Sequence, residues 1–169
     1  MERCSWCRGD PVMEEYHDTE WGIPVYRDNE IFERMVLEMF QAGLSWRTIL
    51  HKRPAFRNAF HNFDLHRVAA INEHEVDHLL TQKDIVRHRK KIESAVFNAR
   101  VCVAICEEYG SLQQYLETLQ NWTLEEIRKE FKQRFRFMGP VVTESFLQCM
   151  GLVGPLHEPG CWKQEQEGE

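Results

Sequence analysis

Glycine and proline are scarce in this sequence, with 9 glycines and 6 prolines among 169 residues. This scarcity excludes collagen-like and low-complexity chains, and no internal repeat or linker divides the sequence. Hydrophobic residues make up 43% of the chain, which is enough to bury a core at this length. We therefore expect one folded domain over residues 1–163.

Long hydrophobic runs are also lacking. No run approaches the length of a membrane span, and the first residues lack the basic and then apolar pattern of a secretory signal. These absences predict a cytoplasmic protein that does not attach to a membrane. The end of the chain, residues 164–169, is rich in glutamate and has no large apolar side chain, so we expect a disordered acidic tail there.

Positive charge is in short supply. Lysine and arginine total 21 against 27 aspartates and glutamates, a formal net charge of −6, which excludes binding of nucleic acid by bulk electrostatic attraction. If DNA is the partner, the basic residues must form a local groove. Three basic stretches are available, and each has a solvated helix face as its alternative interpretation: residues 51–57, 87–91 and 128–136.

Strand-like alternation is scarce, whereas apolar residues recur at helical spacing through most of the chain. The sequence therefore predicts an all-α fold. The clearest helix has Asp28 as its N-cap and ends at Ala42-Gly43, with an apolar face made of Ile31, Phe32, Met35, Val36, Met39 and Phe40. Further helices are predicted from Ser45 to just before Pro54, from Asp64, over residues 87–107, from the capping box at Thr123, and from Pro140 to Gly151.

Six cysteines and eight histidines favour metal ligation over disulfides in a chain expected to stay in a reducing compartment. Two ligand-type residues near each end, Cys4 with His17 and His157 with Cys161, would form a closed tetrahedral zinc site that ties the chain ends together. The spacing Cys4-x-x-Cys7 is also common among metal ligands. From the residues alone, Cys7 therefore remains an alternative or additional ligand.

Glu38 lies at the edge of the apolar face of its predicted helix, seven residues after Ile31. A partly buried carboxylate is costly unless it meets a hydrogen-bond donor, so Glu38 is either a binding residue or a rim residue in water. Aromatic residues beside a carboxylate can stack on a base flipped out of DNA, with ordinary core packing as the alternative. The aromatic residues open to either interpretation are Trp6, Tyr16, Trp21 and Trp46.

Residues 135–140 join two predicted helices by a short turn, with Gly139 directly before Pro140. Backbone N–H groups at the start of the second helix can bind a phosphate. An ordinary helix–helix connection has the same pattern. Both interpretations stay open at this point.

Four motifs in fixed order carry a family pattern: Arg3-Cys4-x-Trp6, Tyr16-His17-Asp18-x-Glu20-Trp21-Gly22-x-Pro24, Glu38-x-x-Gln41-Ala42-Gly43-Leu44-Ser45-Trp46 and His157-x-x-x-Cys161. The chain resembles the bacterial 3-methyladenine DNA glycosylase I family. The resemblance implies a single-domain helix-hairpin-helix DNA glycosylase fold, with a zinc site joining the N- and C-terminal segments. It also implies a base-excision repair enzyme that hydrolyses the N-glycosidic bond of 3-methyladenine in alkylated double-stranded DNA without cutting the strand, and we expect it to be a monomer.

The same resemblance implies roles for individual residues. The ligands of a structural zinc ion are Cys4, His17, His157 and Cys161, with Cys7 excluded. The catalytic residue is Glu38, and the base pocket also contains Tyr16 and Trp46, with Trp6 and Trp21 close by. The DNA-gripping hairpin consists of Phe137, Met138, Gly139 and Pro140. The aspartate that many helix-hairpin-helix glycosylases use is absent, so we expect water attack to depend on positioning.

Overall fold

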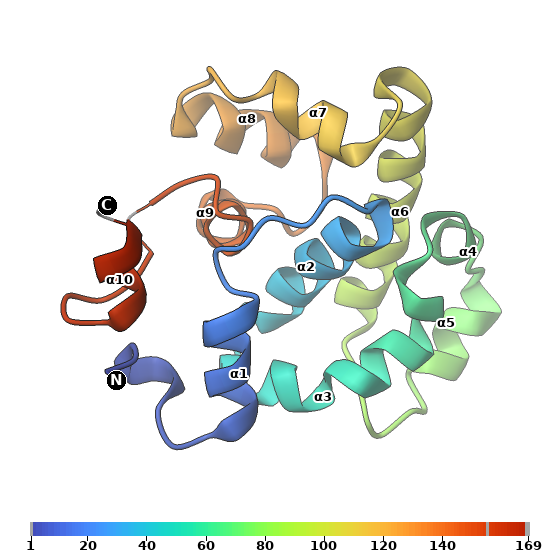
Figure 1. Ribbon diagram of the computed structural model, residues 1–169. Helices are drawn as coiled ribbons and strands as arrows, with labels where there is room; N and C mark the ends of the chain where they lie inside the picture. The colour runs from blue at the N-terminus through green and yellow to red at the C-terminus, as the bar shows by residue number, and fades with distance from the viewer. Residues whose placement is uncertain (1, 155, 168–169) are drawn as a thin grey trace. The chain divides into compact units, whose positions relative to one another are not determined.

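A computed structural model of the chain describes residues 2–154 and 156–167. Every regular element in these residues is helical, which confirms the predicted all-α fold (Figure 1). None of the described helices is both long and apolar enough to cross a bilayer. The elements are η1 (Ser5–Cys7), α1 (Pro11–Thr19), α2 (Asp28–Gln41), α3 (Trp46–Ala59), η2 (His61–Phe63), α4 (Leu65–Ala69), α5 (Glu73–Leu79), α6 (Arg89–Tyr109), α7 (Leu112–Thr118), α8 (Leu124–Arg134), α9 (Pro140–Cys149) and α10 (Trp162–Glu167), where η marks a 3-10 helix.

The chain forms two compact units. The first consists of residues 1–24 and 145–169, so it contains both ends of the sequence, and the second consists of residues 25–144. Helix α9 begins in the second unit and ends in the first. The candidate metal ligands near the two chain ends therefore belong to one unit.

Helix α2 forms the core of the second unit. Its residues 31–40 are all buried. The ring of Phe40 packs against that of Phe56, with the centroids 4.9 Å apart, and lies 6.1 Å from that of Phe60. Helices α3, α6 and α7 all contact α2. Because protein cores are close-packed, α2 is a rigid support for the side chains that it carries.

The side chains that cap helices test several predicted helix starts. Ser45, Asp64 and Thr123 each accept a backbone N–H at the start of α3, α4 and α8, and Thr123 forms the full capping box. These three predictions are confirmed. Asp28 does not cap α2, which begins at Asp28 itself. Its carboxylate instead accepts the N–H of Leu112 at the start of α7, at 2.9 Å, a contact between residues too far apart in the sequence to be predicted.

The prediction that the helix after Ser45 stops before Pro54 is wrong, because α3 continues through the proline to Ala59. A proline inside a helix removes one hydrogen bond and crowds the preceding turn, at a cost of about 3 kcal/mol. The residues beyond it carry Phe56 and Phe60, whose side chains are fully buried. Burying two phenylalanine rings offsets the local penalty, so tertiary packing overrides the helix-breaking tendency of proline.

The predicted long helix over residues 87–107 is α6, which starts two residues later because the His88 side chain caps it.

The start and end of α9 agree with the sequence. Pro140 is the first residue of α9, and Gly151 follows its end, as predicted. Gly151 has a φ of +70°, and a Cβ at this position would collide with the carbonyl oxygen of Gly22. Only glycine fits there without strain.

The predicted disordered tail over residues 164–169 differs from the structure, which places residues 162–167 in α10. The start of this helix is fixed by the N–H of Trp162, which donates to the carbonyl oxygen of Glu2 at 2.9 Å. An anchored first turn lets the polar residues that follow continue the helix. Residues 168 and 169 lie outside the described residues.

The capping box of α8 yields a stability prediction. Thr123→Ala removes the hydroxyl that accepts the N–H of Glu126, so we expect the free energy of unfolding to fall by about 1 kcal/mol. Urea denaturation measures the change. Thr123→Ser keeps the hydroxyl and should stay within about 0.5 kcal/mol of the wild type. Equal losses in both variants would contradict a role for the cap.

Candidate functional site

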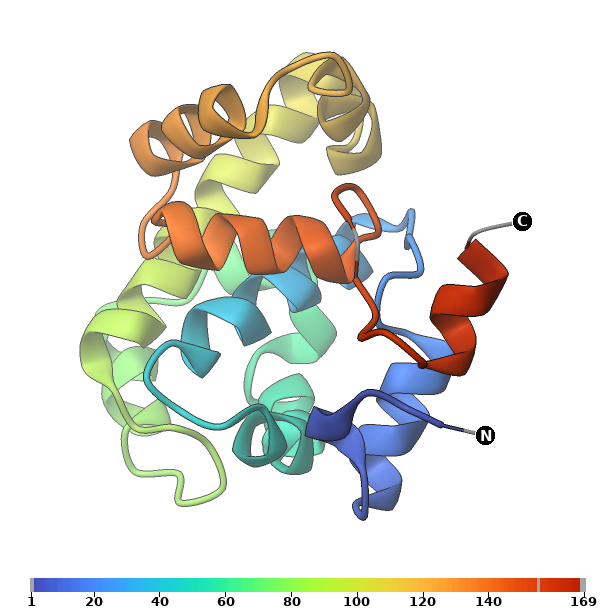
Figure 2. The same cartoon turned by 90° about the vertical axis from the view of Figure 1, so that its left-hand side faces the viewer.

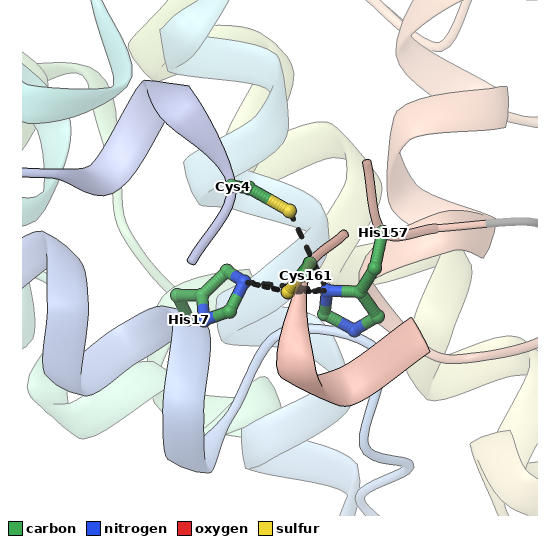
Figure 3. Close-up of side chains that lie close together, drawn as sticks. All are labelled: Cys4, His17, His157 and Cys161. Carbon is green, nitrogen blue, oxygen red and sulfur yellow. Dashed lines mark hydrogen bonds between the residues drawn. The ribbon is translucent and has the colours of Figure 1, made fainter. Parts of the chain in front are cut away.

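The four predicted metal ligands come together in the first unit (Figure 3). Cys4 and His17 come from the N-terminal segment, and His157 and Cys161 from the residues just before α10. All four side chains are buried, and their donor atoms lie within 4.8 Å of one another. The chain thus forms a cluster with the donor chemistry of a closed metal site.

Distances within the cluster fit tetrahedral coordination. With Zn–N bonds of about 2.0 Å and Zn–S bonds of about 2.3 Å, a tetrahedron places two nitrogens about 3.3 Å apart and a nitrogen and a sulfur about 3.5 Å apart. Nε2 of His17 lies 3.3 Å from Nδ1 of His157. Sγ of Cys161 lies 3.4 Å from the first of these nitrogens and 3.8 Å from the second, and Sγ of Cys4 lies 3.7 Å from the second. These four distances are therefore close to those of a tetrahedral metal site, and all the donor atoms lie within 4.8 Å of one another.

A hydrogen-bond chain orients one of the candidate ligands. Nδ1 of His17 lies 2.8 Å from a carboxylate oxygen of Asp18, which leaves Nε2 to face the cluster. Arg3 donates two hydrogen bonds to the same carboxylate, from Nε and Nη2, at 2.9 and 2.8 Å. The Arg3 guanidinium, with a smaller effect from His17, lowers the pKa of Asp18 to about 2. Histidines that bind metal usually have such a carboxylate on the second nitrogen.

Cys7 lies outside the cluster. Its thiol donates to the carbonyl oxygen of Cys4 at 3.2 Å, and its side chain is fully buried. Burial raises the pKa of the Cys7 thiol to about 11 and also raises the pKa of Cys4, so the positions of the two thiols, and not their pKa values, distinguish them. The structure thus places Cys4, and not Cys7, in the cluster with His17, His157 and Cys161.

Three aromatic residues predicted for the base pocket lie against this cluster. The rings of Trp6 and Trp21 meet edge to face with centroids 5.1 Å apart, and Trp6 lies 6.4 Å from Tyr16. The Trp21 ring is 5.0 Å from that of His157, and the Trp6 ring is 5.6 Å from that of His17. The candidate ligands and the predicted pocket aromatics thus form one packed group.

Glu38 belongs to the second unit and lies in the last turn of α2. It is only 7% exposed. Burial raises the pKa of Glu38 to about 8, because the ionised carboxylate loses its hydration. The carboxyl is therefore uncharged at neutral pH until a positive charge or a strong donor approaches it. Groups perturbed in this way are typical of binding and catalytic sites.

Trp46, the other predicted pocket residue of the second unit, is half-buried and is the first residue of α3. A short turn, residues 42–45, connects it to the helix that carries Glu38. Within this turn Gly43 has a φ of +81°, and the side-chain amide of Gln41 donates to the carbonyl oxygen of Leu44 at 2.9 Å. Glu38 therefore lies one helical turn before this hydrogen-bonded connection, and Trp46 directly follows it.

The predicted DNA hairpin lies between α8 and α9 (Figure 2). Phe137 turns the chain with a φ of +55°. Met138 is buried, and its carbonyl oxygen accepts the hydroxyl of Thr143 at 3.1 Å. Gly139 precedes Pro140, the first residue of α9. Because the Met138 side chain belongs to the core, a ligand at this turn would meet backbone N–H groups rather than a row of side chains.

A cavity of about 670 Å³ in the second unit contains none of the predicted site residues. Polar side chains such as Arg27, His61 and His66 line part of it. Three consecutive residues at its edge, 61–63, have φ values between +53° and +58°. This cavity is therefore not the predicted base pocket.

Comparisons with known proteins agree with the resemblance. The family model of methyladenine glycosylases matches residues 6–130. DNA-3-methyladenine glycosylase 1 of Escherichia coli (strain K12) is 39% identical, over 95% of this chain and 96% of that protein. The chain belongs to the methyladenine glycosylase family.

Solved structures place the fold in the same methyladenine glycosylase family. A variant of 3-methyladenine DNA glycosylase I in complex with 3-methyladenine superposes with a TM-score of 0.87 at 34% identity, covering 96% of this chain and 97% of that one. The 3-methyladenine DNA glycosylase I of Staphylococcus aureus, described for its recognition of 3-methyladenine, gives a TM-score of 0.86 at 35% identity and covers 96% of both chains. The likeness therefore extends over nearly the full length.

Two residues of this family member have contacts that the sequence analysis missed. Asp18 and Arg3 orient the candidate ligand His17 through their hydrogen-bond chain. Both residues stand in the motifs that carried the resemblance, and Asp18 directly follows the histidine. An acidic residue next to a ligand-type histidine was the available signal.

Part of the positive charge in the basic stretches of this methyladenine glycosylase is engaged in contacts within the fold. Lys91 is buried. Several arginines are bound to acidic side chains: Arg53 and Arg57 to Glu33, Arg89 to Asp77 and Glu93, and Arg128 to Glu125 and Glu144. These pairs neutralise much of the positive charge that the sequence offered for a DNA groove.

The raised pKa of Glu38 makes the stability of the fold depend on pH. The ordinary value of 4.5 applies to the unfolded chain, against about 8 in the fold. Below pH 4.5 both states are protonated, and the carboxyl does not destabilise the fold. As the pH rises toward 8, the unfolded chain loses its proton while the folded chain keeps it, so stability falls by about 1.4 kcal/mol per pH unit.

Glu38→Gln removes this titration, so we expect the variant to become progressively more stable than the wild type from about pH 5 to about pH 8. The difference should reach several kcal/mol, measured by chemical denaturation at three pH values. Glu108→Gln changes an exposed glutamate and should show a small difference that does not vary with pH. The same flat result for Glu38→Gln would contradict the buried, protonated state.

Proposed function

We propose that this chain is a DNA-3-methyladenine glycosylase of base-excision repair, which hydrolyses the N-glycosidic bond of 3-methyladenine in alkylated double-stranded DNA. One observation carries the proposal: the chain matches, almost end to end, proteins named for this activity. Residues 1–163 would act together as the glycosylase domain. We further propose that the protein acts as a monomer in the cytoplasm.

The cluster of Cys4, His17, His157 and Cys161 is proposed to hold a zinc ion. Its two thiols and two imidazole nitrogens are ligands that zinc prefers, and their spacing supports this metal. When bound, the ion would supply structural cross-linking, because four protein ligands leave no position for water or substrate. Its task would then be to join the chain ends and to support the aromatic rings packed against it.

The base pocket is proposed to consist of Glu38 with Trp46 and Tyr16, and Trp6 and Trp21 close by. Methylation at N3 gives adenine in DNA a delocalised positive charge, which is attracted to aromatic faces. Glu38 would accept a hydrogen bond from the exocyclic amine of the flipped base. The approach of this cation also favours ionisation of the buried carboxyl, so an undamaged, neutral adenine gains less from the same pocket.

The chemistry needs little acid catalysis. When the bond between the sugar and the cationic base breaks, its electron pair passes to the base, which leaves neutral. A water molecule then adds to the sugar carbon and loses a proton to solvent or to a nearby group. Because no amine of the protein attacks the sugar in this scheme, we propose a monofunctional enzyme that leaves the strand intact.

DNA binding is proposed to use α8, the turn at residues 137–140 and α9 as a helix-hairpin-helix element. Phe137 and Gly139 shape the turn, the buried Met138 anchors it, and Pro140 begins the helix. The N-terminus of a helix such as α9 favours an anionic partner such as a DNA phosphate. This contact would position the strand without reading its sequence.

Metal removal tests the zinc proposal. We expect the purified protein to contain about one zinc ion per chain, and Cys161→Ala to lose it and to melt roughly 10 °C lower or more. Elemental analysis and thermal unfolding measure the two effects. Cys7→Ser is the matched control, because it alters a buried cysteine outside the cluster and should keep its zinc. An apoprotein of unaltered stability but without activity would favour a catalytic metal instead.

Base excision tests the pocket. Glu38→Gln and Trp46→Ala should each slow the release of 3-methyladenine from methylated DNA by roughly tenfold to a hundredfold, the scale of one lost hydrogen bond to a charged group or one stacking partner. Chromatography of the released bases under single-turnover conditions measures the rates. Unchanged release by Glu38→Gln would refute its role.

Experiments on the wild-type protein distinguish a monofunctional glycosylase from two alternatives: an enzyme that forms a covalent intermediate, and a DNA-binding protein without activity. Trapping of a covalent protein–DNA adduct by borohydride would contradict the monofunctional mechanism. A wild-type protein that binds methylated DNA but releases no base would be a zinc-stabilised DNA-binding module.

A further inference from the structure

Two buried polar side chains on α6 have no part in the proposed chemistry. Lys91 is 6% exposed and Asn98 is fully buried. They are seven residues apart, so they lie on the same face of the helix, about 10 Å apart along its axis. Burying a lysine is costly, and burial lowers the pKa of Lys91. An apolar residue of similar size would avoid this penalty, so the polar groups need a reason to be there.

Lys91 binds the end of the helix that carries Glu38. Its ammonium donates to the carbonyl oxygen of Phe40 at 3.0 Å and to that of Ala42 at 2.7 Å. These carbonyls belong to the C-terminal turn of α2, where intrahelical partners run out and a positive charge is favourable. Ala42 also begins the turn that leads to Trp46. Lys91 thus fixes the backbone between the two pocket residues of the second unit.

Asn98 binds the chain directly before the hairpin. Its side-chain NH₂ donates to the carbonyl oxygen of Arg136, and its Oδ1 accepts the N–H of the same residue, both at 2.8 Å. Two bonds to one residue fix the orientation of its backbone. The next residue, Phe137, has the left-handed φ that turns the chain. The NH₂ group also lies 3.1 Å from Sδ of Met39, next to Glu38 on α2.

We infer that Lys91 and Asn98 are positioning residues with separate tasks in the glycosylase reaction. Lys91 holds the turn between Glu38 and Trp46 in the geometry that binds the methylated base. Asn98 holds the hairpin in the geometry that binds the DNA backbone. This inference rests on the proposed base pocket and DNA hairpin, because neither side chain is expected to touch the substrate itself.

Two binding measurements on the zinc-containing protein separate the tasks. Free 3-methyladenine probes the base pocket alone, and a duplex with a tetrahydrofuran abasic analogue probes the contacts to DNA alone. We expect Lys91→Met to weaken binding of the base on the order of tenfold and to leave the abasic duplex within about twofold. Asn98→Leu should show the opposite pattern.

A third buried polar residue on the same helix provides the matched control. Ser94 is 3% exposed and donates only to the carbonyl oxygen of Lys90 in its own helix. Ser94→Ala should leave both affinities within about twofold of the wild type. Circular dichroism and thermal melting check that each variant is folded. If Asn98→Leu does not fold, Asn98→Asp keeps the acceptor for the N–H of Arg136 and should weaken only duplex binding.

The possible results distinguish a wrong positioning role from a wrong base pocket. Opposite patterns in Lys91→Met and Asn98→Leu support the inference, and equal losses in both assays, or none, overturn it. If Glu38→Gln weakens binding of 3-methyladenine while Lys91→Met does not, the positioning role of Lys91 is wrong and the pocket stands. If Glu38→Gln binds the base like the wild type, the pocket itself is wrong, and the task of Lys91 is overturned with it.

Discussion

The contact between Cys4, His17, His157 and Cys161 is the constraint on which the first unit depends. That unit is made of two terminal pieces, residues 1–24 and 145–169. A small unit buries only a modest share of its apolar surface, and the smallest domains usually need disulfides, metals or partners. Among the largest fully buried side chains of the described residues, Phe146 alone belongs to it, and the other phenylalanines belong to the second unit: Phe32, Phe40, Phe56, Phe60, Phe63 and Phe131. A metal ion bound by the four side chains would therefore supply the cross-link that a larger hydrophobic core makes unnecessary.

The cluster also positions aromatic side chains. The rings of His17 and His157 pack against Trp6 and Trp21, so fixing the ligands also fixes the aromatic side chains. Asp18 extends the network, because its carboxylate orients one ligand and is itself held by an arginine. The helices of this unit are short, and these contacts link the two pieces of chain that carry them.

The second unit, in contrast, has a large hydrophobic core. Its core is large enough to accept an unfavourable group, and Glu38 is that group: a carboxyl buried where charge is disfavoured. Such a residue reduces stability, and chains that keep one usually do so for function. Lys91 and Asn98, inside the same core, are satisfied by backbone groups at or next to the ends of elements, where the regular hydrogen-bond pattern stops. The most specific polar contacts therefore occur next to the residues proposed to bind substrate.

The sequence by itself determined the helical class, the caps at Ser45, Asp64 and Thr123, and the start of α9 at Pro140, because those signals arise within about four residues of each other. It also supplied the four residues that the structure brings together as a candidate metal cluster, with a choice involving Cys7 that spacing alone left open. Local patterns of this kind do not depend on the rest of the chain.

Only the tertiary structure decided the contacts between distant segments. In the structure α3 continues through Pro54, Asp28 accepts an N–H at the start of α7, and Lys91 is buried although its sequence neighbours predict a basic surface. In each case the free energy of packing or of satisfying a distant backbone group exceeds the local preference. A sequence read a few residues at a time contains no measure of that energy, because the partners meet only when the chain folds.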